Sequence, residues 1–477
     1  RRKIWMNLDV KQIDAIVEKI VARLSQPEPT LLPRVEVGDG IFQNIDEAVR
    51  AAHQAQYNLV ERTSIQKRKE IIEVIRKVAC DNAKEWAQME LVEAEMGRFE
   101  DKVKKIIASS MVPGMEDLQT IAYSGDRGMT IIERAPYGVI ASINPITNAV
   151  PTILFNNIMM IAGGNSVVHN PHPRSKVSSA KAIQVFNKAI QSIGGPPNLT
   201  TAIVEPTVES AQALMKHPLV KLLVITGGHG VIQVAQQSGK KVIAGGPGNP
   251  PVIVDETANL EKAAKFIIEG ASFENDTPCA SEKEIIVVES VADELKVQLK
   301  KNGAYEINPN QLEQLVSKVF REVRGPGKAG LINYEYIGKD AKVLLGLIGI
   351  KVTNDVKIVI AETDRNHPLV WTEQSMPLIP FVRVKDAEEA MNLAIEAEQG
   401  FGHTIVMHSV DLERLSRMSR RVDAAILVKN GSSLAGVGVA GEGFISFHVA
   451  TGAEGHTSPT LFTRARRCCM VDFFKLK

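Results

Sequence analysis

The sequence predicts an α/β protein made of two α/β lobes in tandem. Its 477 residues exceed what one hydrophobic core usually serves, since cores stop growing at about 250 to 300 residues. Short β-branched segments alternate with helical segments, a rhythm typical of a parallel sheet covered by helices. Two such series follow one another, so we expect two lobes with a ligand cleft at their junction.

The first residues of the chain precede both series. Between Asn7 and Leu24, apolar residues recur at helical spacing and predict one amphipathic helix. A proline-rich stretch follows over residues 26–36, and it cannot continue a helix but acts as a semi-stiff spacer. We therefore expect a helix within residues 1–25 that a linker holds away from the body.

The first lobe is expected to begin with helices and to continue with alternating strands and helices. From Val37 to about Gly114 the chain predicts helix, mainly over Asn44–Arg62 and Ser64–Glu95. The strands of the first series are expected at Val139–Ile143, Ser166–His169, Thr200–Val204, Leu222–Thr226 and Lys241–Ala244. The helices between them are expected at Val177–Ile193, Val208–Lys216 and Val231–Ser238.

The second lobe repeats this alternation. Its strands are expected at Pro251–Asp255, Ile285–Glu289, Lys357–Glu362, Phe381–Val384, Thr404–Ser409 and Ala424–Lys429. Helical segments such as Leu260–Glu269 and Ala387–Glu398 separate them. No repeat of 20 to 50 residues is visible, so solenoid and propeller architectures are not expected.

Composition argues against several classes of function. The formal net charge is +1, so the chain lacks the basic excess that marks partners of nucleic acid or of an anionic membrane. No apolar run reaches the roughly 18 residues of a membrane span. The four cysteines form no CxxC pair and the ten histidines no HExxH motif, so no metal site is predicted. We expect a small-molecule partner and a reducing cytoplasm.

Cys279 stands in a polar loop, Phe273–Glu282, between a helical segment and the strand that begins at Ile285. Such a loop can hold a thiol at the wall of a cleft, where its thiolate acts as a nucleophile. A lone cysteine is more often a small buried hydrophobic residue. On the residues alone, both interpretations stay open.

Two further positions lie where open α/β sheets bind ligands. Asn148 follows the strand Val139–Ile143 in a polar turn, and its amide could donate to an oxyanion or cap the next helix. Gly227 and Gly228 end a strand and open a helix, where free N–H groups attract phosphate; a tight turn that needs glycine is the alternative. The literal GxGxxG at Gly436–Gly441 has no amphipathic helix after it and is discounted.

From the end of the linker onward, the chain resembles the aldehyde dehydrogenase superfamily. The resemblance implies that Cys279 is the nucleophile, that Asn148 donates to the oxyanion, and that Glu373, in Glu-Gln-Ser-Met-Pro, holds the nicotinamide ribose. It also places Gly227 and Gly228 on the phosphate side of an NAD site. The other residues implied at this cofactor site are Ile143, Pro145, His169, Asn170, His229, Ala244 and Gly245.

The fold implied by this resemblance has a Rossmann-like cofactor domain, a catalytic domain and a small β-arm. We expect the NAD-binding domain at residues 37–117 and 139–248, and the catalytic domain at residues 249–455. Residues 118–138 and 456–477 are then expected to form the arm through which subunits of this family join, here into a homodimer or homotetramer.

Within the superfamily, the chain resembles the CoA-acylating propionaldehyde and acetaldehyde dehydrogenases of bacterial microcompartments. The stretches that carry this resemblance are Glu95–Lys102, His172–Arg174, Pro278–Cys279 with Glu282–Glu284, and Gly402–Thr404. The detached helix and its linker resemble that group's encapsulation peptide. This implies that residues 7–24 bind a microcompartment shell protein and that the enzyme works in a microcompartment lumen within the bacterial cytoplasm.

Two departures from the hydrolytic members bear on the reaction. Ile243 stands where those enzymes have the glutamate that activates a deacylating water, and Asn170 stands where they have a lysine that contacts the adenosine ribose. The first departure favours oxidation of propionaldehyde or acetaldehyde with NAD, followed by transfer of the acyl group from Cys279 to coenzyme A. The alternatives are a hydrolytic enzyme that releases free acid, an acyl-phosphate reductase, and a non-catalytic assembly component.

Overall fold

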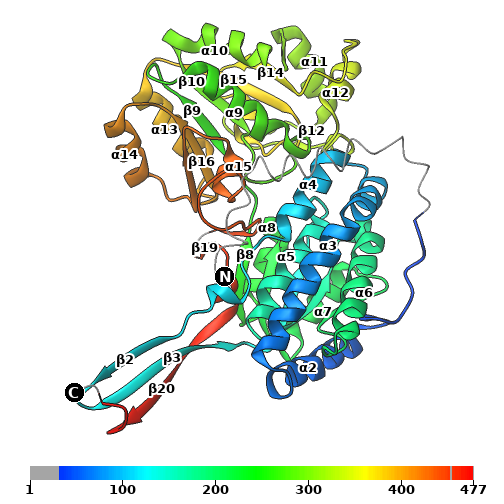
Figure 1. Cartoon of the computed structure of the whole chain (residues 1–477). Coiled ribbons are helices and arrows are strands. Elements are labelled where there is room, and N and C mark those ends of the chain that lie inside the picture. The colour runs from blue at the N-terminus through cyan, green and yellow to red at the C-terminus, as the bar shows by residue number, and fades with distance from the viewer. Residues whose placement is uncertain (1–31, 452–453, 476–477) are drawn as a thin grey trace.

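The computed structural model describes residues 32–451 and 454–475. Figure 1 shows two lobes, one above the other, and a narrow arm of strands that projects away from them. The parallel sheets within the two lobes confirm the predicted α/β fold class. The helix predicted over Asn7–Leu24 lies outside the described residues.

The first lobe contains a six-stranded parallel sheet. In spatial order its strands are β1 (Ile41–Phe42), β6 (Thr200–Ile203), β5 (Ser166–Asn170), β4 (Val139–Ile143), β7 (Val220–Thr226) and β8 (Lys241–Gly245). The chain moves outward from β4 to β6 on one side, and from β7 to β8 on the other. The strand order therefore reverses between β4 and β7, and ligands of open α/β sheets bind at the carboxyl ends of such a pair.

Helices cover both faces of this sheet. One face packs against α5 (Ala149–Ala162) and α6 (Lys176–Ser192), over which α3 (Ile65–Ala94) and α4 (Phe99–Ser109) lie. The other face packs against α2 (Ile45–Glu61), α7 (Val208–Lys216) and α8 (His229–Gln236). Every residue of α5 is buried, because α3, α4 and α6 cover the side that faces away from the sheet. This explains why α5 is apolar all round rather than amphipathic.

The second lobe contains a seven-stranded parallel sheet. In spatial order its strands are β11 (Ala304–Ile307), β14 (Ile358–Thr363), β15 (Leu378–Val384), β10 (Glu284–Val288), β9 (Pro251–Val254), β16 (Thr404–His408) and β17 (Ile426–Lys429). One face packs against α9 (Leu260–Ser272) and α10 (Glu289–Lys301), the other against α13 (Ala387–Ala397) and α14 (Leu412–Arg421). Burial on both faces explains why these strands are continuous apolar runs.

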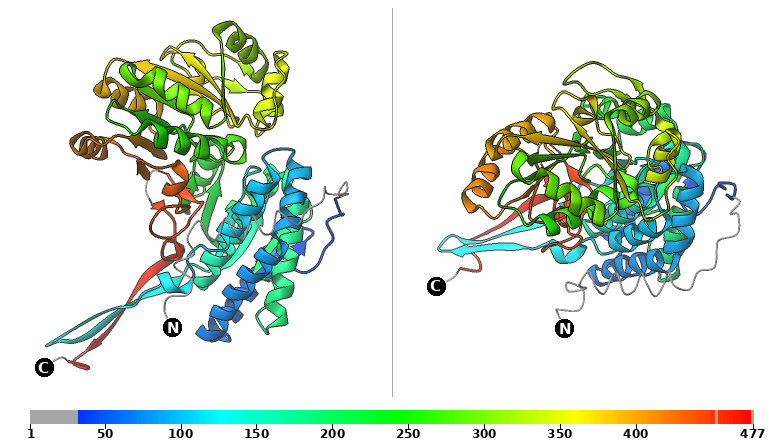
Figure 2. Two further views of the ribbon diagram at one scale, coloured as in Figure 1. Left: turned by 45° about the horizontal axis from the view of Figure 1, so that its top comes forward. Right: turned by 90° about the horizontal axis from the view of Figure 1, so that it is seen from above.

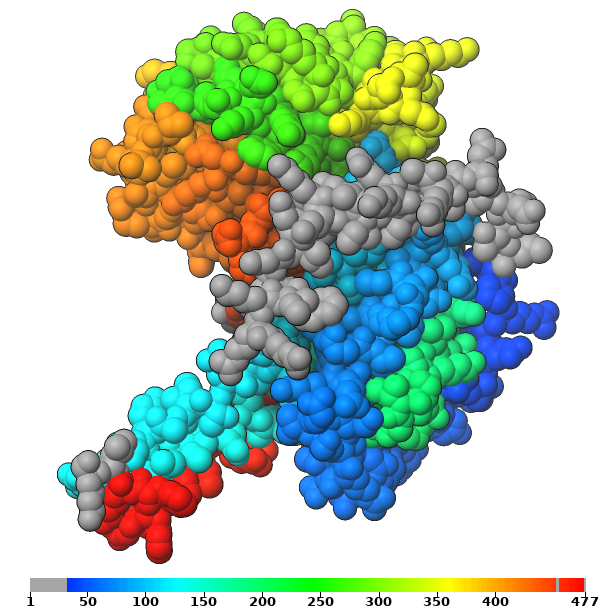
Figure 3. Space-filling model, viewed as in Figure 1, coloured from blue at the N-terminus to red at the C-terminus, as the bar shows by residue number. Residues whose placement is uncertain are grey.

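The arm is a separate antiparallel sheet of three strands. It consists of β2 (Ile121–Gly125), β3 (Gly128–Pro136) and β20 (Thr463–Val471), with β3 in the centre. Both views of Figure 2, like the space-filling view of Figure 3, show the arm standing clear of the two lobes. Within the described part of the chain, no helix combines the length and apolarity needed to cross a bilayer.

One expectation for the first lobe was wrong. We expected only helix between Val37 and Gly114, but the short strand β1 lies there and pairs with β6 at the edge of the first sheet. Two residues are too few for an alternating apolar pattern to appear, although Ile41 is fully buried in the core of the first lobe.

Candidate active site

The amino-terminal ends of four neighbouring strands in the second sheet carry the candidate reactive residues. In the spatial order β15, β10, β9 and β16, the residues at or shortly before these ends are Glu373, Cys279, Gly248 and His403. Residues 246–250 connect the carboxyl end of β8 directly to the amino end of β9. The ligand-binding edge of the first sheet therefore faces this edge of the second.

The loop that leads to Cys279 has an unfavourable backbone. Glu274, Asn275 and Asp276 have φ angles of 51°, 55° and 63°, a left-handed conformation that costs most side chains of order 1 kcal/mol or more. None of the three is glycine. A backbone of this kind persists only where neighbouring groups hold it.

Buried polar contacts supply part of that support. The Lys283 ammonium donates to the carbonyl oxygens of Asp276 at 2.6 Å and of Pro278 at 3.1 Å, and its Nζ lies 2.9 Å from Asp276 Oδ1. The Asn275 amide donates to the carbonyl oxygen of Gly338 at 2.8 Å. Burial raises the pKa of the Asp276 carboxyl well above its usual range, although Lys283 lowers it. The residues immediately before Cys279 are thus held by Lys283 and by the backbone of Gly338.

His403 contacts the thiol. Its Nε2 lies 3.0 Å from Cys279 Sγ, while its Nδ1 lies 2.9 Å from Thr404 Oγ1. The backbone N–H of His403 donates to Glu398 Oε1 at 2.8 Å, which fixes the start of β16. When Nδ1 carries the proton and donates to Thr404, Nε2 has a free lone pair directed at the thiol.

The surroundings keep both groups of this pair neutral. Burial, with a smaller contribution from the negative charge of Glu373, raises the pKa of the Cys279 thiol to about 12, although Lys283 and Lys105 lower it. Burial also lowers the pKa of His403 to about 3. Near neutral pH the pair is therefore a thiol and a neutral imidazole, and the imidazole can accept the thiol proton as sulfur forms a bond.

Asn148 immediately precedes α5, but its side chain does not cap the helix. Its side chain makes no capping bond, and its Oδ1 is buried without a hydrogen-bond partner among the described residues. The N–H of Val150 instead donates to Glu90 Oε1 at 2.7 Å. Because Glu90 satisfies this end of the helix, the Asn148 amide remains available to a ligand.

The glycine turn after β7 is open. The N–H of Gly227 donates to the Gly245 carbonyl at 3.1 Å, whereas a Cβ added to Gly228 or Gly230 would meet no atom within 4 Å. Thr226 Oγ1, just before this turn, is buried without a partner in the described chain. Free helix N–H groups, an orphaned hydroxyl and open space fit a phosphate group.

The remaining residues predicted at the cofactor site lie at the carboxyl ends of their strands. They are Ile143 at the end of β4 and Pro145 shortly after it, His169 and Asn170 on β5, Ala244 and Gly245 on β8, and His229 at the start of α8. The His169 ring is fully buried and lies 3.0 Å from Asn157 Oδ1. The Asn170 amide binds Thr207 and Ser210 of the α7 cap. These two side chains are occupied within the lobe, and the Asn170 carbonyl oxygen accepts from the N–H of Asn144 at 3.2 Å.

Glu373 lies close to the nucleophile. The N–H of Gly248 donates to its carboxylate, and burial raises the pKa of this carboxyl. A Cβ on Gly248 would approach the Cys279 carbonyl oxygen to 2.5 Å and His403 Cγ to 3.0 Å. Glycine at this position thus lets the three neighbouring strand ends converge.

Comparisons with known proteins assign the family. The model of the family described as "Aldehyde dehydrogenase family" matches residues 33–444. The chain belongs to the aldehyde dehydrogenase family. It is 40% identical to the acetaldehyde dehydrogenase (acetylating) EutE of Salmonella typhimurium, and this match covers 98% of the chain and 100% of the relative. It is also 40% identical, over 98% of its length and 100% of the relative, to a propanal dehydrogenase (CoA-propanoylating) of the same organism.

Solved structures give the same assignment. A propionaldehyde dehydrogenase of Rhodopseudomonas palustris, with bound CoA and an acylated cysteine, has a TM-score of 0.89 and 42% identity, covering 92% of this chain and 100% of the other. A propionaldehyde dehydrogenase from a fucose-utilisation microcompartment of Clostridium phytofermentans has a TM-score of 0.88 at 41% identity, covering 91% and 99%.

At the position where the family resemblance implies the hydrolytic glutamate, this aldehyde dehydrogenase has Ile243. Ile243 is fully buried in the core of the first lobe, on β8. Two histidines near the site were not singled out by the sequence reasoning. His403 contacts Cys279, and His448 is fully buried against Gly245. The only signal for His403 was that Gly402–Thr404 contributed to the family resemblance, and His448 gave none.

Proposed function

We propose that this aldehyde dehydrogenase is CoA-acylating: it oxidises a short-chain aldehyde, propionaldehyde or acetaldehyde, with NAD and transfers the acyl group from Cys279 to coenzyme A. The observation that carries the proposal is the 3.0 Å contact between Cys279 Sγ and His403 Nε2. The names of its relatives, acetylating and CoA-propanoylating at 40% identity, supply the acyl acceptor.

The first step is attack on the aldehyde. As Cys279 Sγ bonds to the carbonyl carbon, His403 Nε2 takes the thiol proton, so a free thiolate with its high pKa need not accumulate. The carbonyl oxygen becomes an oxyanion. The Asn148 amide, which no protein group uses, and the N–H of Cys279 are the donors proposed for it.

The nicotinamide dinucleotide, when bound, supplies the acceptor for the hydride. The open turn at Gly227 and Gly228 and the first turn of α8 would hold its pyrophosphate, with Thr226 beside them. Glu373, at the end of β15 nearest Cys279, would hold the nicotinamide ribose. The carboxyl ends of β4, β5 and β8 would form the rest of this site.

The acyl group then leaves Cys279 for a thiol. No carboxylate occupies position 243 to activate water, because Ile243 is buried in the core. Once His403 has released the first proton to solvent, its neutral ring can accept the proton of the CoA thiol as that thiol attacks the thioester. It then returns this proton to the Cys279 sulfur, which leaves as the acyl–CoA bond is completed. On this mechanism CoA enters the cleft that the reduced nucleotide has vacated, which gives ping-pong kinetics.

The test follows NADH formation from acetaldehyde, propionaldehyde and butyraldehyde, with and without CoA, and identifies the acyl product. We expect sustained turnover and an acyl-CoA product only when CoA is present. Free acid formed without CoA would support the hydrolytic alternative. CoA-independent activity with an acyl phosphate would support the reductase alternative, and no activity with any substrate would support an assembly role.

The arm suggests how subunits join. We propose that residues 118–138 and 456–477 link subunits into a homodimer or homotetramer, with residues 37–117 and 139–248 serving NAD and residues 249–455 serving catalysis. The arm exposes large apolar side chains in the single chain, among them Tyr123 and Phe473, and such surface favours a partner. Sedimentation at micromolar concentration should give an oligomer, and a monomer would contradict the proposal.

The segment at residues 7–24 is proposed to bind a microcompartment shell protein by laying its apolar face into a groove. This proposal depends on the sequence pattern and on relatives described from a microcompartment. Deleting residues 1–25 should leave kcat and KM nearly unchanged but abolish co-localisation with shells, and the segment should carry a fluorescent protein into them. Encapsulation of the truncated enzyme, or a loss of many degrees in Tm, would contradict it.

A further inference from the structure

A buried cluster of charges lies behind the nucleophile loop, and the mechanism above does not use it. Lys102 and Lys105 of α4 have exposed fractions of 2% and 3%, and Glu274 is fully buried. Glu274 Oε2 accepts from Lys102 Nζ at 3.1 Å and from Lys105 Nζ at 2.7 Å. Charges are rarely buried this completely, because losing water is costly even for a matched pair.

The cluster joins the two lobes. Figure 1 shows α4 at the end of the first lobe that faces the second, whereas Glu274 belongs to the second lobe. Helix α4 holds Glu274 by its backbone as well as by its side chain. The N–H of Glu274 donates to Asp101 Oδ2 at 3.1 Å, and Glu274 Oε1 accepts from the N–H of Arg98 at 3.2 Å. These contacts hold the left-handed residue that begins the Cys279 loop.

Lys105 makes one further bond. Its Nζ donates to the carbonyl oxygen of Thr147 at 3.1 Å. Thr147 immediately precedes Asn148, so the peptide group that joins them is fixed by the same ammonium that binds Glu274. One side chain thus bridges the loop of the proposed oxyanion donor and the loop of the nucleophile, which come from different lobes.

We propose that Lys105 is a positioning residue that holds the Asn148 amide and the Cys279 thiol in one frame across the lobe boundary. Catalysis by a preorganised donor needs its position fixed to within a fraction of an ångström. The Asn148 side chain has no bond of its own to fix it, so its position depends on its backbone. The inference rests on the proposed function.

The test is a double-mutant cycle on kcat. We expect Lys105→Met to lower kcat about a hundredfold, as a shift of about 1 Å can do, with the Kd for NADH changed little. In an Asn148→Ala background the same substitution should lower kcat only slightly further, because the donor that it positions is gone. A decrease that multiplies fully with that of Asn148→Ala would overturn the proposal, since general loss of structure acts independently of Asn148.

A second variant keeps the proposal testable if Lys105→Met does not fold. Lys105→Gln keeps a hydrogen-bond donor but removes the charge, and it should show an intermediate loss with the same dependence on Asn148. If the fold losses of kcat from Lys105→Gln and from Asn148→Ala multiply fully in the double variant, the proposal is overturned as well. If the unaltered enzyme oxidises no aldehyde, the proposed function fails; if it is active and the cycle is multiplicative, only the role of Lys105 fails.

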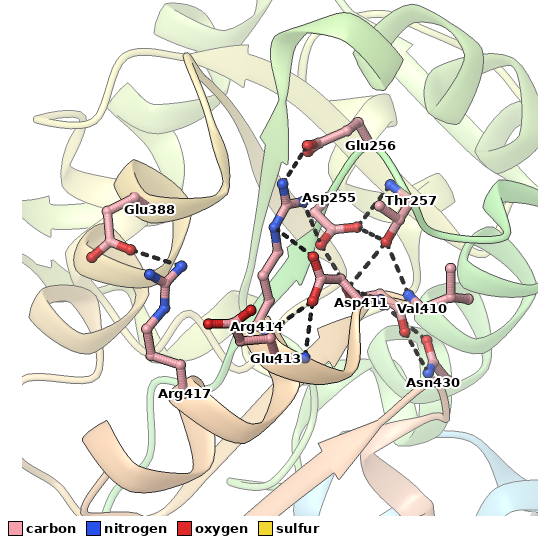
Figure 4. A network of polar contacts seen from close by, with 11 residues as sticks. Asp255, Glu256, Thr257, Glu388, Val410, Asp411, Glu413, Arg414, Arg417 and Asn430 are labelled. Carbon is pink, nitrogen blue, oxygen red and sulfur yellow. Dashed lines mark hydrogen bonds and ion pairs between the residues drawn. The ribbon is translucent and has the colours of Figure 1, made fainter.

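The chain offers a matched control in the second lobe. Figure 4 shows Arg414 bound to the fully buried Asp255, with Nη1 3.1 Å from Oδ2, and to Glu256 on the surface. No residue of the proposed mechanism belongs to this network. Arg414→Met should lower Tm while leaving kcat within about twofold, with or without Asn148. A hundredfold loss of kcat from this control would show that any damaged ion cluster slows the enzyme, and would overturn the proposal.

Discussion

The two halves of the site differ in how firmly the protein holds them. On the nucleophile side, buried charges bind the loop before Cys279, and His403 has a partner at each ring nitrogen. On the nucleotide side, a Cβ at Gly228 or Gly230 would meet open space. On the proposed mechanism the acyl group stays on Cys279 while the reduced nucleotide leaves and CoA enters. Rigidity thus lies where bonds form, and openness where ligands exchange.

The largest effect is expected at the centre of the rigid half. Cys279→Ala should abolish both aldehyde oxidation and the acyl-enzyme, as followed by NADH formation and by the mass of the protein, because no other nucleophile lies at this position. Tm should change little. Cys80→Ala is the matched control, since Cys80 is an exposed thiol on α3. Activity retained in the Cys279 variant would show that Cys279 is not the nucleophile, and the comparison between the two sides of the site would then have no basis.

The next effect is the pH dependence of alkylation. With a pKa of about 12, the Cys279 thiol is protonated at neutral pH, and its thiolate fraction grows about tenfold per pH unit below that value. In a His403→Ala variant, which has no base beside the thiol to take its proton, inactivation by iodoacetamide should therefore accelerate about a thousandfold from pH 7 to pH 10. A rate that reaches a plateau near pH 8 would mean that the Cys279 thiol is solvated or lies beside a positive charge, rather than being buried with a raised pKa.

Much of this architecture was predictable, because apolar periodicity is local. The strand β4 and the helix α7 begin and end where the sequence predicted. The contacts that make the site were not predictable, since they join distant residues. His403 and Cys279 are 124 positions apart, and Lys105 and Glu274 are 169 apart. The left-handed residues Glu274–Asp276 also lack the glycine that would have signalled them.

A somewhat smaller effect is expected where the halves meet. Asn148→Ala should lower kcat by roughly two to three powers of ten, the usual effect of removing one oxyanion donor. Stability should hardly change, because Glu90 rather than Asn148 caps α5. Asn308→Ala is the control, since Asn308 caps α11 (Pro309–Val319) through a capping box; it should cost about 1 kcal/mol of stability and leave kcat intact. The reverse pattern would assign Asn148 to capping.

The sharpest comparison changes one glycine on each side to alanine. Gly248→Ala brings a Cβ to 2.5 Å from the Cys279 carbonyl and 3.0 Å from His403 Cγ. Because neither the strand end nor the buried ring can move freely, kcat should fall about tenfold or more.

Gly228→Ala adds its Cβ to open space at a φ of −70°, which suits any residue. That space is where the pyrophosphate is proposed to lie, so the variant should raise KM for NAD several-fold while kcat at saturating NAD stays within about twofold. Steady-state kinetics with varied NAD separates the two effects. If Gly228→Ala lowered kcat as much as Gly248→Ala, the nucleotide side would be as rigid as the nucleophile side, and the distinction drawn between them would be lost.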